Sequence, residues 1–422
     1  MLKALEIDEE KYTKYMNENF KDTRIIFTQF PEYANLKKDE KTKSKKIAVI
    51  DKETGEILAL TIVIFYQKFK IFYKAEILYG PIIKEENYFR FAEILTAIRK
   101  KIFKNLRVLK LRITPIVYKH IYKDINIIKK DINKNIEESI LKEGFRKNKE
   151  ENYQNVEMPF RYFYSKNIEN MEYKEIENSF VRTFRNRIKK SEKELLQIRF
   201  LKYNEIDVFY KMLLHTYGRV DTNQSADINR LKNMYKEFKD KVYFPVIYID
   251  ILKTEKAYID DKNKKNDELK NITKILADKE ISKNTYKKAK NRKEQLEIAI
   301  KSLEKNIEEI KELKKEETEK GNEDLKVDIY GGVFIDSKLD FIYFLGGGYD
   351  KYFKYNAAPK MHKEMLKIAT EKNKKIYNLF GISGVFNEDA PDYGVLKFKQ
   401  TFNGYVEEFI GTYDYNRFNM NI

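Results

Sequence analysis

The sequence predicts an α/β (α+β) protein built from two similar domains, with a long helical hairpin inserted into the second. The order of a strand meander, a helix and a returning strand occurs twice in the 422 residues, and no glycine or proline lies between Pro245 and Gly321. A chain of this length exceeds a single ordinary core. Because 42% of its residues are hydrophobic, including 31 Tyr and 28 Phe, we expect most of the chain to be folded.

The first domain, residues 1–150, contains the first copy of this order. Strands rich in β-branched and aromatic residues are expected at ILALTIVIF, 57–65, and KIFYKAEILYGPII, 70–83. Apolar residues at helical spacing predict a helix over 87–103. The strand RVLKLRIT, 107–114, follows and is ended by a proline.

The second domain, residues 151–252 and 322–422, repeats this order with a different sequence. A strand, a helix and another strand in succession imply a right-handed parallel crossover in an otherwise antiparallel sheet. This succession is typical of the GNAT-like acyltransferase fold, and two copies imply a duplication. The elements expected in this copy are strands at 242–251, 328–336 and 340–347, a helix at 357–374 and a strand at 375–383.

The inserted segment, residues 253–321, has the pattern of an antiparallel coiled-coil hairpin. Apolar residues in its second half are spaced alternately four and three apart, which forms a heptad seam. A break near 277–286 divides the segment into two helices of about 40 Å each at about 1.5 Å per residue. The arm is either a stiff solvated element or a lysine-rich surface for RNA or a partner, and the spacing does not decide between them. The seam residues are Leu296, Ile300, Leu303, Ile307 and Ile310.

The chain is strongly basic, with 84 Lys and Arg against 67 Asp and Glu and a formal charge of +17. This balance favours a polyanionic partner such as nucleic acid or a phosphate-rich lipid surface, although an AT-rich genome would explain much of the lysine equally well. The absence of cysteine excludes a thiol nucleophile, a disulfide and a thiolate metal site. With only His120, His215 and His362 available, a histidine triad or zinc site is disfavoured, and we expect no metal.

No targeting or membrane-crossing segment is expected. The first ten residues contain acids and lack the apolar core of a signal peptide. The most apolar run, 57–66, is half as long as a membrane span. We therefore expect a cytoplasmic protein, and leave contact with the inner face of the membrane open.

The run GGGYD, 346–350, is a candidate for binding an anion. It follows a predicted strand, and the backbone N–H groups of Gly346 and Gly347 could hold a phosphate or an acyl oxygen. The run lacks both the P-loop and the dinucleotide fingerprint, and a structural turn explains it equally well.

The C-terminal stretch carries the most specific signal. Residues 377–414 read YNLFGISGVFNEDAPDYGVLKFKQTFNGYVEEFIGTYD, with Gly-x-Ser-Gly, Glu-Asp-Ala, Gly-Val and Phe-Lys in succession. This run resembles the corresponding segment of the Fem family of peptidoglycan aminoacyltransferases, the FemA, FemB and FemX type. Residues 344–369 and the basic segment 182–201 are similar to the same family, and the helical hairpin occurs where FemA-like members carry one.

The resemblance implies two GNAT-like domains with a coiled-coil arm. Such a protein would transfer an amino acid from aminoacyl-tRNA to the stem-peptide lysine, or to the growing bridge, of a lipid-linked peptidoglycan precursor. Aminoacyl-tRNA would be the co-substrate with no other cofactor, and a homodimer or a complex with related Fem proteins stays open. An acyl-CoA-dependent GNAT-type N-acyltransferase is one alternative, disfavoured because neither domain shows a clear pyrophosphate loop. A non-catalytic RNA-binding scaffold is the other.

The resemblance also suggests two residues that bind the precursor. The family's spacing of a glutamine, an aromatic residue and a lysine matches Gln29, Tyr33 and Lys37. The family's Thr-x-x-Arg pattern matches Arg219. Lys37 and Arg219 would then form a clamp of two cations on the pyrophosphate, although either could equally be a surface cation.

The family's Phe-Lys pair matches Phe398 and Lys399, in a Lys-Phe-Lys stretch that we expect to be exposed. The ring of Phe398 would stack on the terminal adenine of tRNA. The ammonium of Lys399 would stabilise the oxyanion that forms when the acceptor amine attacks the aminoacyl ester. The alternative is a structural lysine at the edge of a strand.

The chain departs from the family pattern at two places. Thr114 and Pro115 stand where members often carry Asp-Pro, so no proton acceptor is assigned there, and Asp392 is one candidate for that role. Tyr79 stands where an arginine is common, which puts a substrate contact at that position in doubt.

Overall fold

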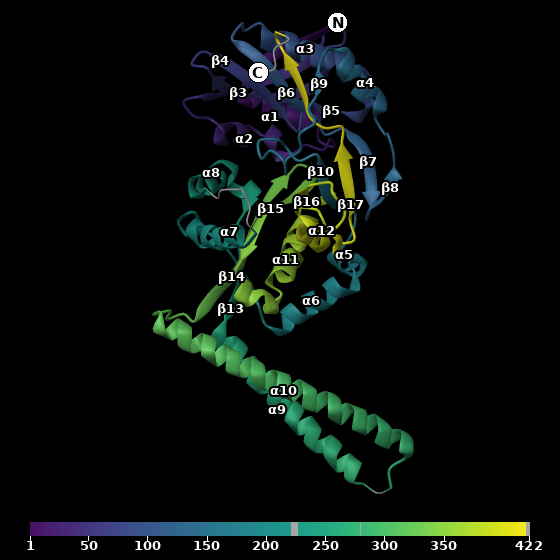
Figure 1. Ribbon diagram of the computed structural model, residues 1–422, viewed down its shortest axis with the longest axis vertical. Coiled ribbons are helices and arrows are strands. Elements are labelled where there is room, and N and C mark those ends of the chain that lie inside the picture. Colours follow the sequence, from purple (N-terminus) through teal and green to yellow (C-terminus); the bar gives the residue numbers. More distant parts are fainter. Residues whose placement is uncertain (221–226, 279, 419–422) are drawn as a thin grey trace.

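Two mixed sheets follow one another along the long axis of the molecule, and a pair of long helices projects from the second sheet (Figure 1). The computed structural model describes residues 1–220, 227–278 and 280–418. Each sheet contains one parallel pair of strands joined through a helix, as the sequence predicts. These pairs are β4 with β6 in the first sheet and β15 with β16 in the second.

The first sheet forms the upper domain in Figure 1. Helix α3 (Phe91–Phe103) connects its two parallel strands and buries one apolar face against the sheet. The strands lie in the order β1 (Leu2–Ile7), β2 (Thr42–Asp51), β3 (Ile57–Lys68), β4 (Phe72–Leu78), β6 (Val108–Thr114), β18 (Tyr413–Asn416) and β9 (Arg146–Lys147), and β5 (Ile82–Ile83) pairs with β3.

The second sheet is larger and carries the arm. Helix α11 (Ala357–Glu371) connects its two parallel strands. The strands lie in the order β11 (Gln197–Phe200), β13 (Pro245–Asp250), β14 (Lys326–Ser337), β15 (Asp340–Gly348), β16 (Ile376–Ile382), β10 (Tyr162–Asn167), β17 (Tyr405–Phe409), β7 (Tyr118–Lys123) and β8 (Asn126–Lys129), and β12 (Val242–Tyr243) pairs with β14.

Strand pairing crosses the predicted domain boundaries in two places. Strands β7 and β8 lie within residues 1–150 but pair in the second sheet, where β7 joins β17. Strand β18 lies within residues 322–422 but pairs with β6 in the first sheet. Residue patterns predict where strands occur, but the partner of a strand depends on contacts between distant parts of the chain, so the sequence did not reveal this exchange.

Two glycines in β14 show how helices cover both faces of the second sheet. A Cβ on Gly331 would lie 2.8 Å from the ring of Phe209, and one on Gly332 would lie 3.0 Å from Met361. Successive residues of a strand point to opposite faces, so α7 and α11 pack on opposite faces of the sheet. Apart from the arm, the other helices of the two domains are α1 (Glu9–Asn19), α2 (Pro31–Leu36), α4 (Lys134–Lys142), α5 (Tyr173–Ser179), α6 (Arg182–Lys193), α7 (Ile206–Val220), α8 (Ile228–Phe238) and α12 (Tyr393–Gln400). The 3-10 turns include η3 (Tyr203–Glu205), η4 (Lys239–Lys241) and η5 (Asp350–Tyr355).

The arm consists of α9 (Ile251–Ala277) and α10 (Lys283–Glu319), which lie side by side away from both sheets (Figure 1). Their lengths correspond to about 40 and 55 Å at about 1.5 Å per residue. Arg292 and Glu268 form an ion pair across the two helices at 2.7 Å. Of the predicted seam, Leu296, Ile300, Leu303 and Ile310 are buried and Ile307 is half-buried.

A buried ion network fastens the two domains together. Arg24, in the loop after α1, donates to both carboxylate oxygens of Asp340 and, at 2.7 Å, to Glu407. Both acids belong to the second sheet and are at most 1% exposed. Burial alone would lower the pKa of Arg24, but the two carboxylates overcome it and the pKa is raised, so the cation is held charged at the interface.

We predict that Arg24→Met destabilises the protein by about 3–5 kcal/mol, because removing one partner of a buried ion pair leaves the other charge uncompensated. Urea unfolding at neutral pH measures the change. Lys45→Met is the matched control, since Lys45 pairs with Glu6 at 2.7 Å on the surface and such pairs contribute about 0–1 kcal/mol. Equal losses in the two variants would contradict the prediction.

Candidate active site

The parallel strands β15 and β16 separate partway along the second sheet. They pair only from Asp340 opposite Ile376 to Ile342 opposite Asn378. Beyond that point β15 stays with β14 and β16 stays with β10. In open α/β sheets, ligands bind beyond the carboxyl ends of parallel strands where neighbours diverge, so this wedge is the candidate active site.

The first sheet has no such wedge between its equivalent strands. Strands β4 and β6 stay paired from Tyr73 opposite Val108 to Leu78 opposite Thr114. Tyr79, which follows β4, is 5% exposed and donates a hydrogen bond from its hydroxyl to the carbonyl of Phe160 at 3.0 Å. Its ring packs against Phe163 and Phe380 of the second domain, so the tyrosine joins the domains.

A kink in β16 shapes the wedge. Phe380 has φ 62°, a conformation uncommon outside glycine that typically costs about 1–3 kcal/mol. The side chain of Asn378 stabilises it by accepting from the Phe380 N–H at 2.8 Å. The same side chain donates to Asp340 at 2.8 Å, so the kink is tied to the ion network at the domain interface.

Lys399 lies against this kink. It belongs to α12, is 4% exposed, and its Nζ donates to the carbonyl of Gly381 at 2.6 Å and less closely to that of Phe380 at 3.4 Å. Burial lowers the pKa of Lys399 to about 7, although nearby Asp392 acts in the opposite direction. A buried amine that titrates near neutral pH is the kind of group that active sites use for proton transfer and charge stabilisation.

The expectation of an exposed Lys-Phe-Lys stretch is wrong for Lys399. Residues 393–400 form a short helix, and Leu396 and Lys399, three residues apart, both face inward. Lys397 points to solvent. The side chain of Phe398 is half-buried, with ring centroids 5.5 Å from both His362 and Phe402. The structure therefore packs part of the Phe398 ring against the second core, and its stacking on adenine stays a prediction.

Asp392, the candidate proton acceptor, immediately precedes α12, although its side chain makes no capping hydrogen bond to that helix. It is 5% exposed and accepts from the backbone N–H and the hydroxyl of Ser383 at 2.9 and 2.5 Å. Both carboxylate oxygens thus already have a donor. Asp392 lies close enough to Lys399 to affect its pKa, so it orders the lysine's surroundings rather than standing free as a base.

Gly346 and Gly347 lie inside strand β15 and not in the turn that the sequence predicted. Both pair with β14, opposite Gly332 and Gly331. A Cβ on Gly346 would collide with the hydroxyl of Tyr343, and one on Gly347 would lie 3.1 Å from the backbone of Met212 in α7. These glycines allow close packing within the sheet, and their pairing leaves no open loop that could cradle a phosphate.

Lys37 follows the last residue of α2, and α2 packs against α8 of the second domain (Figure 1). Its Nζ lies 5.6 Å from the ring centroid of Tyr33. Burial and the charge of Arg230 lower the pKa of Lys37, while Glu76 and Asp39 oppose this change. The structure therefore brings Lys37 close to Arg230, a residue that the sequence analysis did not single out.

Arg219 lies elsewhere, at the end of α7. Its guanidinium stands 5.1 Å above the ring of Phe353. Burial raises the pKa of Tyr330, and Arg219 and Arg187 both oppose that rise, so the two guanidinium groups lie near this hydroxyl. In the part of the chain that the structure describes, no interaction joins Arg219 to Lys37, and the cation that lowers the pKa of Lys37 is Arg230.

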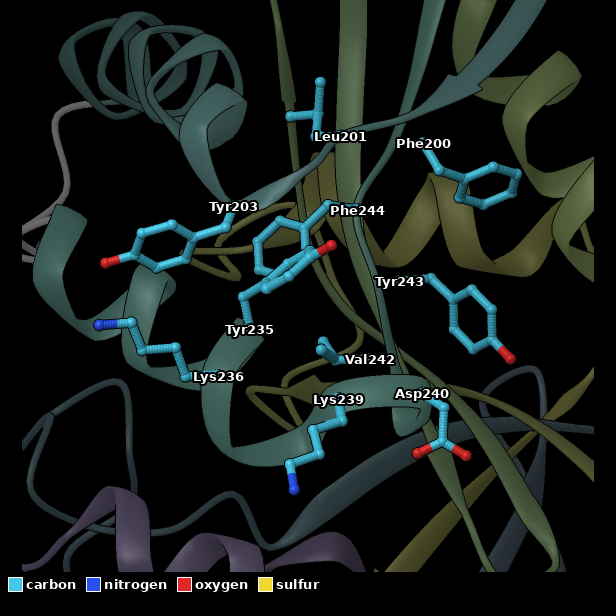
Figure 2. A pocket seen from close by; sticks show the side chains of 10 residues that line it. All are labelled: Phe200, Leu201, Tyr203, Tyr235, Lys236, Lys239, Asp240, Val242, Tyr243 and Phe244. Atoms are coloured by element: carbon cyan, nitrogen blue, oxygen red, sulfur yellow. The ribbon is translucent and has the colours of Figure 1, made fainter.

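A pocket of about 580 Å³ lies between α8, η4 and the edge of the second sheet (Figure 2). The rings of Tyr203, Tyr235 and Phe244 line it together with Lys236 and Lys239. Nζ of Lys236 lies 4.7 Å from the ring centroid of Tyr203. Aromatic faces beside ammonium groups suit stacked bases and phosphates of single-stranded nucleic acid. Lys399 does not line this pocket.

Neither a metal cluster nor a membrane-crossing helix is found in the part of the chain that the structure describes. No three His, Asp or Glu side chains there come together as metal ligands. No helix there combines the length and apolar character needed to cross a bilayer. His362 is a core residue and is 0% exposed. Burial lowers its pKa to about 3, and its Nδ1 lies 2.7 Å from the Tyr377 hydroxyl.

Comparisons with known proteins agree over nearly the whole chain. A model of the FemAB family matches residues 7–420. The chain is 29% identical over 416 residues to the aminoacyltransferase FemA of Staphylococcus epidermidis, covering 96% of this chain and 95% of the relative. It is 28% identical over 398 residues to the aminoacyltransferase FemA of Staphylococcus aureus, covering 92% and 89%. The crystal structure of FemX superposes with a TM-score of 0.76 at 18% identity, covering 98% of this chain and 97% of that one, which confirms the predicted fold.

We predict that Lys399→Met changes how stability depends on pH. The pKa of Lys399 falls from 10.5 to about 7 on folding. Between these values the unfolded chain binds more protons, so Lys399 makes the free energy of unfolding rise with pH, by at most about 1.4 kcal/mol per pH unit. Urea unfolding at several pH values should show a shallower rise for Lys399→Met than for wild type. Lys397→Met, on the exposed side of α12, should keep the wild-type slope, and parallel curves for all three proteins would refute the prediction.

Proposed function

The chain belongs to the FemAB family, and we propose that it transfers an amino acid from aminoacyl-tRNA to the stem-peptide lysine, or to the growing bridge, of a lipid-linked peptidoglycan precursor. The observation that carries the proposal is the match of the family model to residues 7–420, which confirms the resemblance seen in the sequence. The protein is an aminoacyltransferase, as its FemA relatives are. The proposed site of the reaction is the wedge between β15 and β16, because Lys399, a buried lysine of lowered pKa, lies against the kink in β16.

In the proposed reaction, the acceptor amine attacks the ester carbonyl that joins the amino acid to the tRNA. A C–N bond forms and the carbonyl oxygen becomes an oxyanion. The carbonyl is then restored as the ester C–O bond breaks, and the proton lost by the amine nitrogen is balanced by the proton that the ribose oxygen gains as it leaves as a hydroxyl. Lys399 is proposed to donate a hydrogen bond to the oxyanion from Nζ, whose position is fixed by the carbonyl of Gly381 at 2.6 Å. Because burial lowers its pKa to about 7, the same group can hold or release a proton near neutral pH.

The pair of Lys37 and Arg230 is the proposed site for the pyrophosphate of the precursor. Each is a cation, and each comes from a different domain, Lys37 from α2 and Arg230 from α8. Since Arg230 lowers the pKa of Lys37, a bound dianion between them would relieve the repulsion of two like charges. Arg219 is the weaker candidate for this role because its guanidinium lies over the ring of Phe353 and does not interact with Lys37.

The acceptor end of the tRNA is proposed to lie along the basic side of α6 and the end of β15. Arg187 of α6 and Arg219 both lie near the hydroxyl of Tyr330. Helix α6 packs on α11, the helix that connects β15 with β16. The net charge of +17 suits a protein that binds two phosphate-bearing substrates. A lipid-linked acceptor would also bring the protein to a membrane surface.

Incubating the purified protein with charged tRNA and the lipid-linked precursor, followed by mass spectrometry of the product, tests the proposal. An added mass equal to one amino-acid residue is expected, and the value identifies the residue that is transferred. Acetylation when acetyl-CoA is supplied, without transfer from tRNA, would instead assign the chain to the acyl-CoA reaction. No product with either donor would favour a scaffold.

We predict that Lys399→Met lowers kcat in this assay by about 10²–10³, the usual effect of losing one donor to an oxyanion. Lys397→Met should keep the wild-type rate, because Lys397 is the exposed lysine two residues earlier on the same helix. Circular dichroism would check that both variants fold. Unchanged turnover in Lys399→Met would leave the lysine with a structural role only.

We predict that Arg230→Met raises KM for the precursor with little change in kcat, because a phosphate contact holds substrate and transition state alike. Arg219→Met is the matched control and should leave KM for the precursor near the wild-type value. Lys37→Met should resemble Arg230→Met. The opposite result, with Arg219→Met alone raising KM, would restore the clamp that the sequence suggested.

A further inference from the structure

The β7–β8 hairpin lies at the rim of the second sheet (Figure 1). It carries several exposed isoleucines. Strand β8 is the outermost strand, and all four of its residues are exposed. Isolated exposed apolar residues are normal, but a cluster on an edge strand marks a surface that contacts something. The cluster consists of Ile125 at 59% exposed, Ile127 at 46%, Ile128 at 57% and Ile132 at 39%.

Lysines surround these isoleucines. Residues 119–134 contain five lysines and two aspartates. Lysine is depleted in the interfaces between proteins and discourages edge strands from pairing with one another. Isoleucines that can enter an apolar layer, beside lysines that can reach phosphates, fit the surface of an anionic bilayer instead. The lysines are Lys119, Lys123, Lys129, Lys130 and Lys134.

A pocket of about 430 Å³ lies at the root of the same hairpin. Ile128 and Lys129 form part of its wall, and Lys166 of β10 lines it as well. Lys166 is 5% exposed, and its Nζ lies 5.3 Å from the ring centroid of Phe180. In the part of the chain that the structure describes, this ammonium makes no hydrogen bond and no ion pair. A buried cation without a counter-charge is costly, so the pocket calls for an anion.

Lys123 and Glu407 also line this pocket, and both already have partners. Lys123 donates to Oδ1 of Asn403 at 2.6 Å and to the carbonyl of Gly404 at 2.9 Å. Glu407 accepts from Arg24 at 2.7 Å and from Ser165 at 2.6 Å. Burial, and then the charge of Lys123, lower the pKa of Lys166 to about 8, which an incoming anion would reverse.

We propose that the β7–β8 hairpin and the pocket at its root dock the protein on a bilayer of anionic phospholipid. Ile125, Ile127 and Ile128 enter the interfacial layer, Lys129 reaches the lipid headgroups beside them, and Lys166 binds a lipid phosphate in the pocket. The site rests on the proposed function only in that a lipid-linked acceptor is presented at a membrane. It is separate from the wedge at Lys399 and from the pair of Lys37 and Arg230.

Co-sedimentation of the full chain with vesicles tests the proposal without tRNA or precursor. Binding is expected with equal parts of phosphatidylglycerol and phosphatidylcholine, and not with phosphatidylcholine alone. Replacing both Ile127 and Ile128 with Asn should weaken binding by at least about tenfold. Lys166→Gln should weaken it by roughly fivefold. The matched controls are Ile298→Asn, at a position 72% exposed on the arm, and Lys397→Gln on α12, and both should bind as wild type does.

Three outcomes would overturn the proposal. One is equal binding by the hairpin variant and the Ile298→Asn control. Another is stabilisation of wild type, but not of Lys166→Gln, by inorganic phosphate, with no binding to either kind of vesicle, since the pocket would then hold a free phosphate. The third is a dimer in sedimentation that the Ile127 and Ile128 substitutions dissociate, because a second copy of the chain would then cover the hairpin. A protein that binds vesicles but transfers no amino acid would leave this docking site intact and reject the proposed function.

Discussion

The structure depends on one buried cation, Arg24, that neutralises two carboxylates of the opposite domain. Asp340, one of these acids, also accepts from Asn378, and Asn378 in turn holds the kink at Phe380. The carbonyls of this kink receive the ammonium of Lys399. A continuous chain of polar contacts thus leads from the domain interface to the wall of the wedge, so the geometry around the lysine requires that both domains are correctly seated.

The two copies of the fold have taken different roles. The parallel strands of the first sheet remain paired to their ends, whereas those of the second sheet part after three pairs. The second domain therefore supplies the wedge, and the first contributes Lys37 from a helix that packs against α8. A reaction between two large substrates suits this division, because each can be held by a different surface while their reactive ends meet.

Sequence patterns predicted the local elements well and the tertiary relations poorly. The order of strands and helices in both domains, and the heptad seam with Leu296 and Ile310, follow from the spacing of apolar residues, which the structure reproduces. The burial of Lys399 did not follow, because a helix of eight residues in a stretch rich in glycine and acids has too few apolar positions to show which side faces inward. No sequence pattern indicated that Arg24 would pair with Asp340 and Glu407, or that Arg230 would lie near Lys37. Both arrangements arise only when distant elements of the chain pack together.

The exchange of strands between the sheets has a consequence for how the protein can be made. Strand β18 lies between β6 and β9 in the first sheet, although it consists of residues near the end of the chain. During synthesis β6 and β9 emerge from the ribosome long before β18, so the first sheet stays incomplete until β18 has been made. Each sheet is therefore complete only when it contains a strand from the other half of the chain.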